Sequence, residues 1–220
     1  MRQGRLIVLE GGEGCGKTTQ LERLEAYLRP RIGEFGFTAL QLTREPGGSP
    51  LCQKIRQVLL MPDGDEIMQP RAELLLYAAD RAQHVEGWLR PWIHAGNLVL
   101  CDRYTASTVA YQGYGRGLDL ALIGQLNALA TQGLEPDLTL WLDLDPEIGL
   151  ARAMARGTRD RMEQADFQFH QNVRSGFAAI HRDAAPDTVI HIEADQSVEA
   201  VEQEIQQAVW TALTAWASAS

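Results

Sequence analysis

The chain has 220 residues, of which 45% are hydrophobic and 22% charged, and its formal net charge is −9. This size and composition predict one folded domain and exclude disordered, collagen-like and low-complexity proteins. The acidic balance argues against a protein that binds nucleic acid or an anionic membrane by bulk attraction. Three cysteines without a metal-ligand spacing, and a sequence without a signal-peptide core or membrane span, predict a cytoplasmic protein with free thiols.

Five short apolar runs are predicted to be strands, and helical patterns separate them. The strands are expected at residues 5–10, 38–43, 98–102, 138–143 and 189–192. Helices are expected at residues 17–28, 70–94, 120–131 and 198–216, and a further helix begins at Asp145. Loops are expected at residues 44–50, 61–69, 113–117 and 157–164. This alternation predicts a single α/β domain over residues 1–220, with a five-stranded parallel sheet flanked by helices on both faces.

A glycine-rich segment between the first predicted strand and helix matches the motif G-x-x-x-x-G-K-[ST] from Gly11 to Thr18. In such a loop the backbone N–H groups and the helix N-terminus bind phosphate oxygens, the lysine reaches the outer phosphates, and the hydroxyl holds Mg²⁺. We therefore expect ATP to be bound by Gly11, Gly12, Glu13, Gly14, Cys15, Gly16, Lys17, Thr18 and Thr19.

Glu13 places a carboxylate inside this phosphate loop. At about 6 Å from a phosphate charge it would cost about 3 kcal/mol at an effective dielectric constant near 20. We therefore expect Glu13 to point away from the triphosphate, toward a hydrogen-bond donor or a cation across the cleft. The alternative is a solvent-facing residue at the loop tip that contacts nothing.

Charged side chains follow the second and third predicted strands. Arg44 comes after the second strand, Arg56 lies on the next helix, and Asp102 and Arg103 end the third strand. Ligands bind beside the carboxyl ends of strands in open α/β sheets, so we expect these residues to lie next to the phosphate loop. Thr18 and Asp102 are expected to hold Mg²⁺. A surface ion pair is the alternative for any one of the arginines.

Tyr77 and Arg81 are four residues apart in a predicted helix, so their side chains leave the same face about one turn apart. A ring beside a guanidinium suits a nucleobase, which can stack on the ring and hydrogen-bond through its edge. Residues 44–81 are accordingly expected to bind the phosphate acceptor. The alternative is a core tyrosine and a surface arginine.

Residues 152–164 are expected to form a closing lid that supplies transition-state charge, because the variable positions of the phosphate loop carry no basic residue. Four arginines, Arg152, Arg156, Arg159 and Arg161, surround Gly157 in this segment. A plain solvated helix face is the alternative. The catalytic cations are expected to be Lys17, Arg103, Arg152, Arg156 and Arg161.

Taken together, these segments resemble the thymidylate kinase family, P-loop enzymes that phosphorylate dTMP with ATP, over nearly the whole chain. The resemblance depends on Glu10-Gly-Gly-Glu-Gly-Cys-Gly-Lys-Thr-Thr19, Thr43-Arg-Glu-Pro-Gly-Gly48, Asp160-Arg-Met-Glu-Gln164 and the segments 73–84, 102–113, 116–119 and 136–143. The arginine-bearing lid is similar to that of the bacterial type. The implied fold is that of the P-loop nucleoside monophosphate kinases.

The resemblance implies roles around the phosphate and sugar of dTMP. Arg56 and Arg103 would hold the phosphate, and Arg44 would complete the site. Glu13 would accept a hydrogen bond from the 3′-hydroxyl, which gives this carboxylate the donor that it needs. Tyr111 would press against C2′ and disfavour a ribose hydroxyl.

The resemblance also implies how the base is held. Tyr77 would stack on thymine, Arg81 would bond a base carbonyl, and Thr108 and Gln112 would line the base edge. The thymine stacking position is usually Phe in the family, and here it is Tyr77.

The activity implied is in-line transfer of the ATP γ-phosphoryl group to dTMP, giving dTDP and ADP for dTTP biosynthesis, with Mg²⁺ as cofactor. The expected partners are ATP and dTMP and a second copy of the chain in a homodimer, with no nucleic acid or membrane. Another nucleoside monophosphate kinase or a deoxynucleoside kinase stays open, and the base site would distinguish it. A P-loop ATPase, which would hydrolyse nucleotide without an acceptor, is the more distant alternative.

Overall fold

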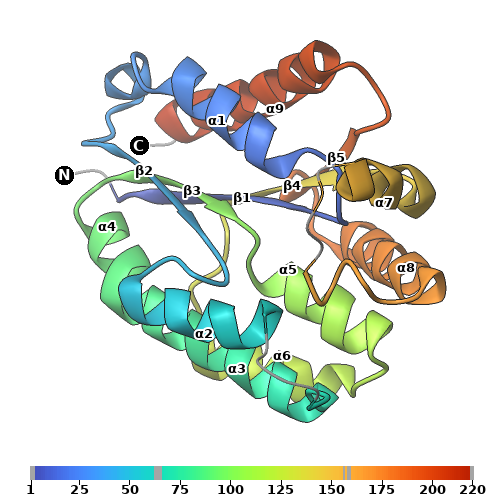
Figure 1. Cartoon of the computed structure of the whole chain (residues 1–220). Coiled ribbons are helices and arrows are strands. Elements are labelled where there is room, and N and C mark those ends of the chain that lie inside the picture. Colours follow the sequence, from blue (N-terminus) through green and yellow to red (C-terminus); the bar gives the residue numbers. More distant parts are fainter. Residues whose placement is uncertain (1–2, 62–65, 156, 158–159, 219–220) are drawn as a thin grey trace.

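The computed structural model describes residues 3–61, 66–155, 157 and 160–218, and these residues contain a five-stranded sheet in the order β2-β3-β1-β4-β5 (Figure 1). All four strand pairings are parallel. The strands are β1 (Arg5–Gly11), β2 (Leu40–Arg44), β3 (Leu98–Asp102), β4 (Leu138–Asp143) and β5 (Val189–Glu193). The predicted α/β fold is therefore confirmed, and each strand lies within two residues of its expected bounds.

Helices cover both faces of the sheet because the central strand β1 is apolar on both sides (Figure 1). Ile7 and Leu9 belong to a core shared with α1 (Lys17–Leu28) and α9 (Val198–Ser218). Leu6 and Val8 belong to a second core on the opposite face. All four side chains have no exposed surface, and each contributes about 2 kcal/mol by burial.

Several further helices complete the two layers. They are α2 (Pro50–Leu60), α3 (Pro70–His84), α4 (Arg90–His94), α5 (Thr105–Thr108), α6 (Leu120–Thr131), α7 (Pro146–Ala155) and α8 (Phe167–Asp183). A short 3₁₀ turn η1 (Ile32–Phe35) follows α1. Within the described part of the chain, every helix is too short or too polar to cross a bilayer.

The helix predicted over residues 70–94 is interrupted by a π-helical turn, η2 (Val85–Leu89), between α3 and α4. Pro91 has no N–H to donate to the carbonyl of Gly87 one turn earlier. The backbone hydrogen bonds before this proline span five residues in place of four, so that Arg90 N donates to Val85 O. The prediction of a helical segment over residues 70–94 is therefore confirmed, and the structure adds the π-helical turn within it.

The loop predicted at residues 113–117 begins later, because a second π-helical segment, η3 (Val109–Gly115), continues from α5. This segment packs on α8, a helix that the sequence analysis did not identify. Asp166 caps α8 by accepting from Phe169 N at 2.7 Å, and Phe169, Val173 and Phe177 bury one face at four-residue spacing.

The carboxyl ends of β2, β3 and β4 lie beside the carboxyl end of β1, where the phosphate loop begins. In the strand register, Leu9 and Arg44 both pair with Asp102, and Gly11 pairs with Leu142 of β4. The predicted gathering of these strand ends is therefore confirmed.

The tip of the phosphate loop packs on the first turns of α7 through two glycines. A Cβ on Gly14 would lie 2.0 Å from Gly149 O, and a Cβ on Gly149 would lie 2.3 Å from Glu13 O. Both contacts are with backbone atoms, so a larger residue at either position would separate the loop from α7.

Gly149→Ala is therefore expected to lower the free energy of unfolding by about 1–3 kcal/mol, the usual cost of overpacking. Urea unfolding followed by circular dichroism measures this change. Gly124→Ala on α6 is the matched control, because a Cβ there meets no heavy atom of the described residues within 4 Å outside its own helix. Gly124→Ala should raise the free energy of unfolding by about 1 kcal/mol, because alanine favours a helix more than glycine does. Equal changes in the free energy of unfolding for the two substitutions would contradict the packing argument.

Candidate functional site

A cleft of about 350 Å³ opens at the carboxyl ends of β1, β2 and β3. It brings together residues predicted for the triphosphate, the metal and the acceptor. The predicted residues that line it are Glu13, Gly14, Gly16, Lys17, Thr18, Thr19, Arg44, Arg56, Tyr77, Arg81, Asp102, Arg103, Tyr111 and Gln112.

The phosphate loop presents backbone donors to this cleft. Gly16 is the N-cap of α1 with φ +94°, and no side chain of the described residues caps this end of the helix. The N–H groups of the first turn are therefore available to an anion. Lys17 Nζ lies over the loop, where it donates to Gly11 O at 3.1 Å and Gly12 O at 2.8 Å.

Cys15 lies underneath the phosphate loop, with 3% of its surface exposed. Its Sγ donates to Gly12 O at 3.1 Å and lies 3.3 Å from Lys17 Nζ. The side chain therefore supports the loop, and any ATP contact of this residue would come from its backbone.

Glu13 has the cationic partner that the sequence analysis required. Its Oε1 accepts from Arg103 Nη2 at 2.9 Å and from the Tyr111 hydroxyl at 2.7 Å. The alternative of a tip residue without contacts is wrong. Burial raises the pKa of Glu13, but attraction by Arg103 and Lys17 together with the Tyr111 hydrogen bond outweighs it and lowers the pKa from 4.5 to about 2.

The backbone of Arg103 explains how its guanidinium reaches across to the phosphate loop. Arg103 has φ +72°, a left-handed conformation that costs a non-glycine residue about 1–3 kcal/mol, and its N–H donates to Leu9 O at 3.0 Å. Nη1 donates to Gly11 O at 2.9 Å and to Ser107 Oγ at 3.1 Å. The guanidinium thus lies between the loop and α5.

Glu10, fully buried at the end of β1, fixes the segment that follows Arg103. Its Oε1 accepts from Tyr104 N at 2.8 Å and Ser107 N at 3.1 Å, and its Oε2 accepts from Ser107 Oγ at 2.5 Å. The sequence analysis gave Glu10 no role of its own. A glutamate at the end of an apolar strand was the available signal, because a buried acid needs donors.

Arg44 and Arg56 bring two cations to the opposite wall of the cleft. Burial lowers the pKa of Arg56, and the like charge of Arg44 lowers it further. Arg56 is held by Pro46 O, which accepts from its Nη1 at 3.0 Å. Two cations that repel each other in one cleft are stabilised by an anion between them, so this wall suits a phosphate.

Asp102 is the carboxylate that fits a metal. Its side chain is 9% exposed, and its Oδ1 is buried without a hydrogen-bond partner among the described residues, while Oδ2 lies 3.9 Å from Arg44 Nη2. Mg²⁺ prefers oxygen ligands, and Thr18 supplies a hydroxyl in the same cleft. The described residues hold no group of three or more His, Cys, Asp or Glu side chains placed for a metal, so phosphate and water would complete the shell.

Arg81 is 2% exposed, which overturns the alternative of a surface arginine. Its Nε donates to Glu45 Oε2 at 2.8 Å, and its Nη2 donates to Tyr104 O at 2.9 Å. Its Nη1 donates to Thr108 Oγ1 at 2.8 Å and to Asn127 Oδ1 at 3.0 Å. Thr108 is thus placed behind Arg81 and is not among the residues that line the cleft.

Tyr77 is half-buried and lines the cleft one turn before Arg81, so the predicted shared face of the helix is confirmed. Burial raises the pKa of Tyr77, and the nearby Glu73 raises it further. The phenol therefore stays protonated at neutral pH.

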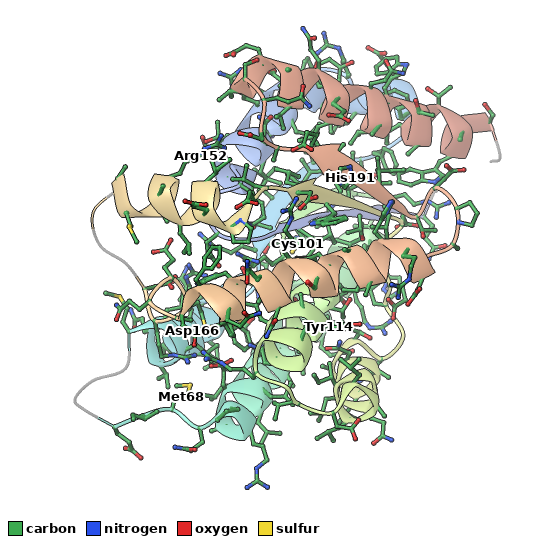
Figure 2. The ribbon with its side chains drawn as sticks, turned by 90° about the vertical axis from the view of Figure 1, so that its right-hand side faces the viewer. Met68, Cys101, Tyr114, Arg152, Asp166 and His191 are labelled. Atoms are coloured by element: carbon green, nitrogen blue, oxygen red, sulfur yellow. The ribbon has the colours of Figure 1, made fainter. Side chains whose placement is uncertain are left out.

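The lid arginines that the structure describes have protein partners outside the cleft. Arg152 points from the face of α7 that is turned away from α8 (Figure 2), where it donates to Ala194 O at 3.5 Å and to Asp195 Oδ1 at 3.4 Å. Arg161 donates to Leu59 O at 2.9 Å and to Glu73 Oε2 at 2.5 Å. Arg156 and Arg159 lie outside the described residues.

From the expected lid, the residues that line the cleft are Asp160, Met162 and Glu163. They were not predicted as site residues. Tyr104, Ser107, Glu45, Pro46 and Leu60 also line it, and Glu45 and Pro46 stand in the same short motif as Arg44.

Comparisons with known proteins agree on one family. The family model described as thymidylate kinase matches residues 9–205. The thymidylate kinase of Cyanothece sp. (strain PCC 7425) is 51% identical over 97% of this chain and 97% of its own length. That of Synechococcus sp. (strain JA-2-3B'a(2-13)) is 54% identical over 87% of each chain. The crystal structure of thymidylate kinase from Ehrlichia chaffeensis is 32% identical with a TM-score of 0.75, and the match covers 94% of this chain and 99% of that one.

The lowered pKa of Glu13 predicts a specific loss of stability in acid. A carboxyl with a pKa of 4.5 when unfolded and about 2 when folded stabilises the protein above pH 4.5, and this contribution is lost as the pH falls toward 2. Between pH 6 and pH 3 the loss from this group is about 2 kcal/mol.

Urea unfolding measures the free energy of unfolding at each pH. Between pH 6 and pH 3, this free energy should fall by about 2 kcal/mol less in Glu13→Gln than in the wild type. Glu22→Gln, at an exposed position of α1, is the control and should lose stability in parallel with the wild type. Identical pH profiles for all three proteins would refute the strong Glu13–Arg103 interaction.

Proposed function

The chain belongs to the thymidylate kinase family, and from this premise we propose that it transfers the γ-phosphoryl group of ATP to dTMP, giving dTDP and ADP. The observation that carries the proposal is the cleft itself, in which a phosphate loop faces a wall of arginines across Asp102, a carboxylate with one oxygen that no described residue hydrogen-bonds. Two phosphate chains can meet in this cleft. The following roles are parts of the same proposal.

The donor triphosphate lies along the phosphate loop and the start of α1. The first-turn N–H groups of α1 donate to its oxygens, and the glycines allow the close approach. Lys17 Nζ exchanges its contacts with Gly11 O and Gly12 O for the outer phosphates. Charged acceptors replace neutral carbonyls in this exchange, so the ammonium binds more strongly.

The acceptor dTMP lies between the arginines and the α3 face. Arg44, Arg56 and Arg103 surround its phosphate, and Glu13 accepts from its 3′-hydroxyl. Tyr111 is held by its hydroxyl bond to Glu13 and lies against the sugar. Tyr77 stacks on the base, and Gln112 bonds its edge. Arg81 donates to a base carbonyl with the one Nη2 hydrogen that Tyr104 O does not accept.

The reaction needs no general base, because the acceptor phosphate is already an anion. Positioning and charge neutralisation supply the rate enhancement. Arg103 is well suited to this work, since its contacts with Gly11 and Ser107 hold the guanidinium before substrates bind. Mg²⁺ on Asp102 and Thr18 would neutralise charge on the transferred phosphoryl group.

The catalytic roles of Arg152, Arg156 and Arg161 stay predictions. Arg152 would have to leave Asp195, a partner that is 55% exposed and therefore weakly bound. Arg161 is tied to a buried carboxylate, so it serves more readily as an anchor for residues 160–163 than as a mobile cation. Closure of residues 152–164 over the cleft would exclude water and prevent hydrolysis of ATP.

We also infer that the protein works in the cytoplasm as a homodimer. Its three cysteines are free thiols, which suits a reducing compartment. Exposed apolar side chains lie on three helices that pack side by side, α2, α3 and α6 (Figure 1). They include Leu51, Val58, Leu75, Leu122 and Leu129. A second copy of this surface would cover them.

A coupled assay of ADP release with dTMP, dUMP, UMP, CMP and AMP tests the activity. We expect dTMP to have the highest kcat/KM, at least tenfold above the ribonucleotide UMP, because Tyr111 would press against C2′ and disfavour a 2′-hydroxyl. Highest activity with another monophosphate would support a different nucleotide kinase. Equal ADP release without any acceptor would support an ATPase and overturn the proposal.

The dimer is tested by sedimentation velocity of Leu75→Glu. A charge on this side chain, which is 57% exposed, should dissociate the dimer because it would be buried without a partner in the interface. Val198→Glu places the same charge at the start of α9, where Val198 is 42% exposed, and should leave the dimer intact. A wild-type monomer would refute the assembly.

A further inference from the structure

Glu73 is a fully buried carboxylate that the mechanism above does not use. It lies on α3, one turn before Tyr77, and receives donors from two other segments of the fold. Its Oε2 accepts from Arg161 Nη1 at 2.5 Å and from Arg116 Nη2 at 3.2 Å. Its Oε1 accepts from Gln112 Nε2 at 2.7 Å. The two guanidinium groups compensate the cost of burying the charge.

The contact with Gln112 fixes the orientation of an amide in the cleft. A carboxylate only accepts hydrogen bonds, so the NH₂ group of Gln112 has to face Glu73. The flipped amide would place two oxygens 2.7 Å apart in a buried site, and would replace the hydrogen bond between them with a repulsive contact. Gln112 therefore turns its Oε1 away from Glu73, and no described residue donates to this oxygen.

Gln112 and Arg81 are both part of the cleft wall, and Tyr77 lies between Glu73 and Arg81 on the same helix. The wall therefore offers an acceptor, Gln112 Oε1, and a donor, the remaining N–H of Arg81 Nη2. A pyrimidine that has a ring N–H next to a carbonyl matches this pair. Cytosine, with a bare ring nitrogen next to an amino group, presents the opposite pattern.

We propose that Glu73 is a positioning residue that sets the base preference of the acceptor site through Gln112. By holding the NH₂ group, it presents the amide oxygen to the base and selects a pyrimidine with a ring N–H over one without. This inference rests on the proposed function, because it requires a nucleotide base beside Tyr77. It adds a residue that touches no substrate yet decides between substrates.

Arg116 donates to both oxygens of Glu73, from Nη2 to Oε2 at 3.2 Å and from Nε to Oε1 at 3.4 Å, and the described contacts include none between Arg116 and the Gln112 amide. Its guanidinium lies 4.5 Å from the centre of the Phe169 ring, which packs on Tyr111. Arg116 therefore provides a control position, since Arg116→Lys keeps a cation near Glu73 while the Glu73–Gln112 hydrogen bond remains.

The test compares kcat/KM for dTMP with kcat/KM for dCMP in Glu73→Gln. An amide at position 73 can donate as well as accept, so Gln112 is free to present either end to the base. We expect the ratio of kcat/KM for dTMP to kcat/KM for dCMP to fall about tenfold or more. In the wild type this ratio is high because dCMP has no ring N–H to pair with the buried Oε1 of Gln112. Arg116→Lys should keep the wild-type preference. Impaired packing alone would lower kcat/KM for both nucleotides and leave their ratio unchanged.

Two further variants keep the test decisive if Glu73→Gln folds poorly. Glu73→Asp retains the charge but withdraws the acceptor from Gln112 by one methylene, and should also lower the preference. Gln112→Met removes both ends of the amide, and adding Glu73→Gln to it should cause no further change in the ratio. An unchanged ratio in Glu73→Asp and Glu73→Gln would overturn the inference while dTMP turnover by the wild type upheld the function. A wild type inert toward dTMP would overturn the function itself.

Discussion

Ion pairs between buried or partly buried glutamates and arginines hold the cleft and its surroundings in place. Glu45 holds Arg81, Glu13 holds Arg103, and Glu73 holds Arg161. Several cations gathered at one sheet edge repel each other, and a buried guanidinium without a partner would cost several kcal/mol. The acids remove both problems, because each carboxylate offsets the positive charge and accepts one N–H of its guanidinium.

The acids also decide which donors stay available to a ligand. Four of the five guanidinium N–H groups of Arg81 donate to other residues, and one is left for a ligand. The four acceptors belong to Glu45, Thr108, Asn127 and Tyr104. In an apolar wall the guanidinium would present all of its donors, and the base site would be less selective. Among the described residues, the buried polar network thus leaves one N–H of Arg81 without a protein acceptor, and in the proposed function this N–H reads one base edge.

The same arrangement connects residues 160–163 to the cleft wall. Arg161 anchors residues 160–163 to Glu73, which in turn contacts Gln112 in the cleft wall. Arg152 on α7, by contrast, donates to the exposed Asp195 and to the backbone of Ala194. In the proposed closure, Arg152 would therefore leave its protein partners more readily than Arg161.

The sequence by itself determined the strands, most of the helices and the phosphate loop, because periodicity and the 11–18 motif are properties of neighbouring residues. It also predicted most of the residues that line the cleft, since parallel strands deliver their carboxyl ends to one edge. The tertiary structure alone decided the burial of Arg81, the position of Thr108 behind it and the outward direction of Arg152. Glu45 and Arg81 are 36 residues apart, and Glu73 and Gln112 are 39 apart. The partner of a buried charge depends on which residues the fold brings close in space. Patterns among neighbouring residues in the sequence therefore do not predict it.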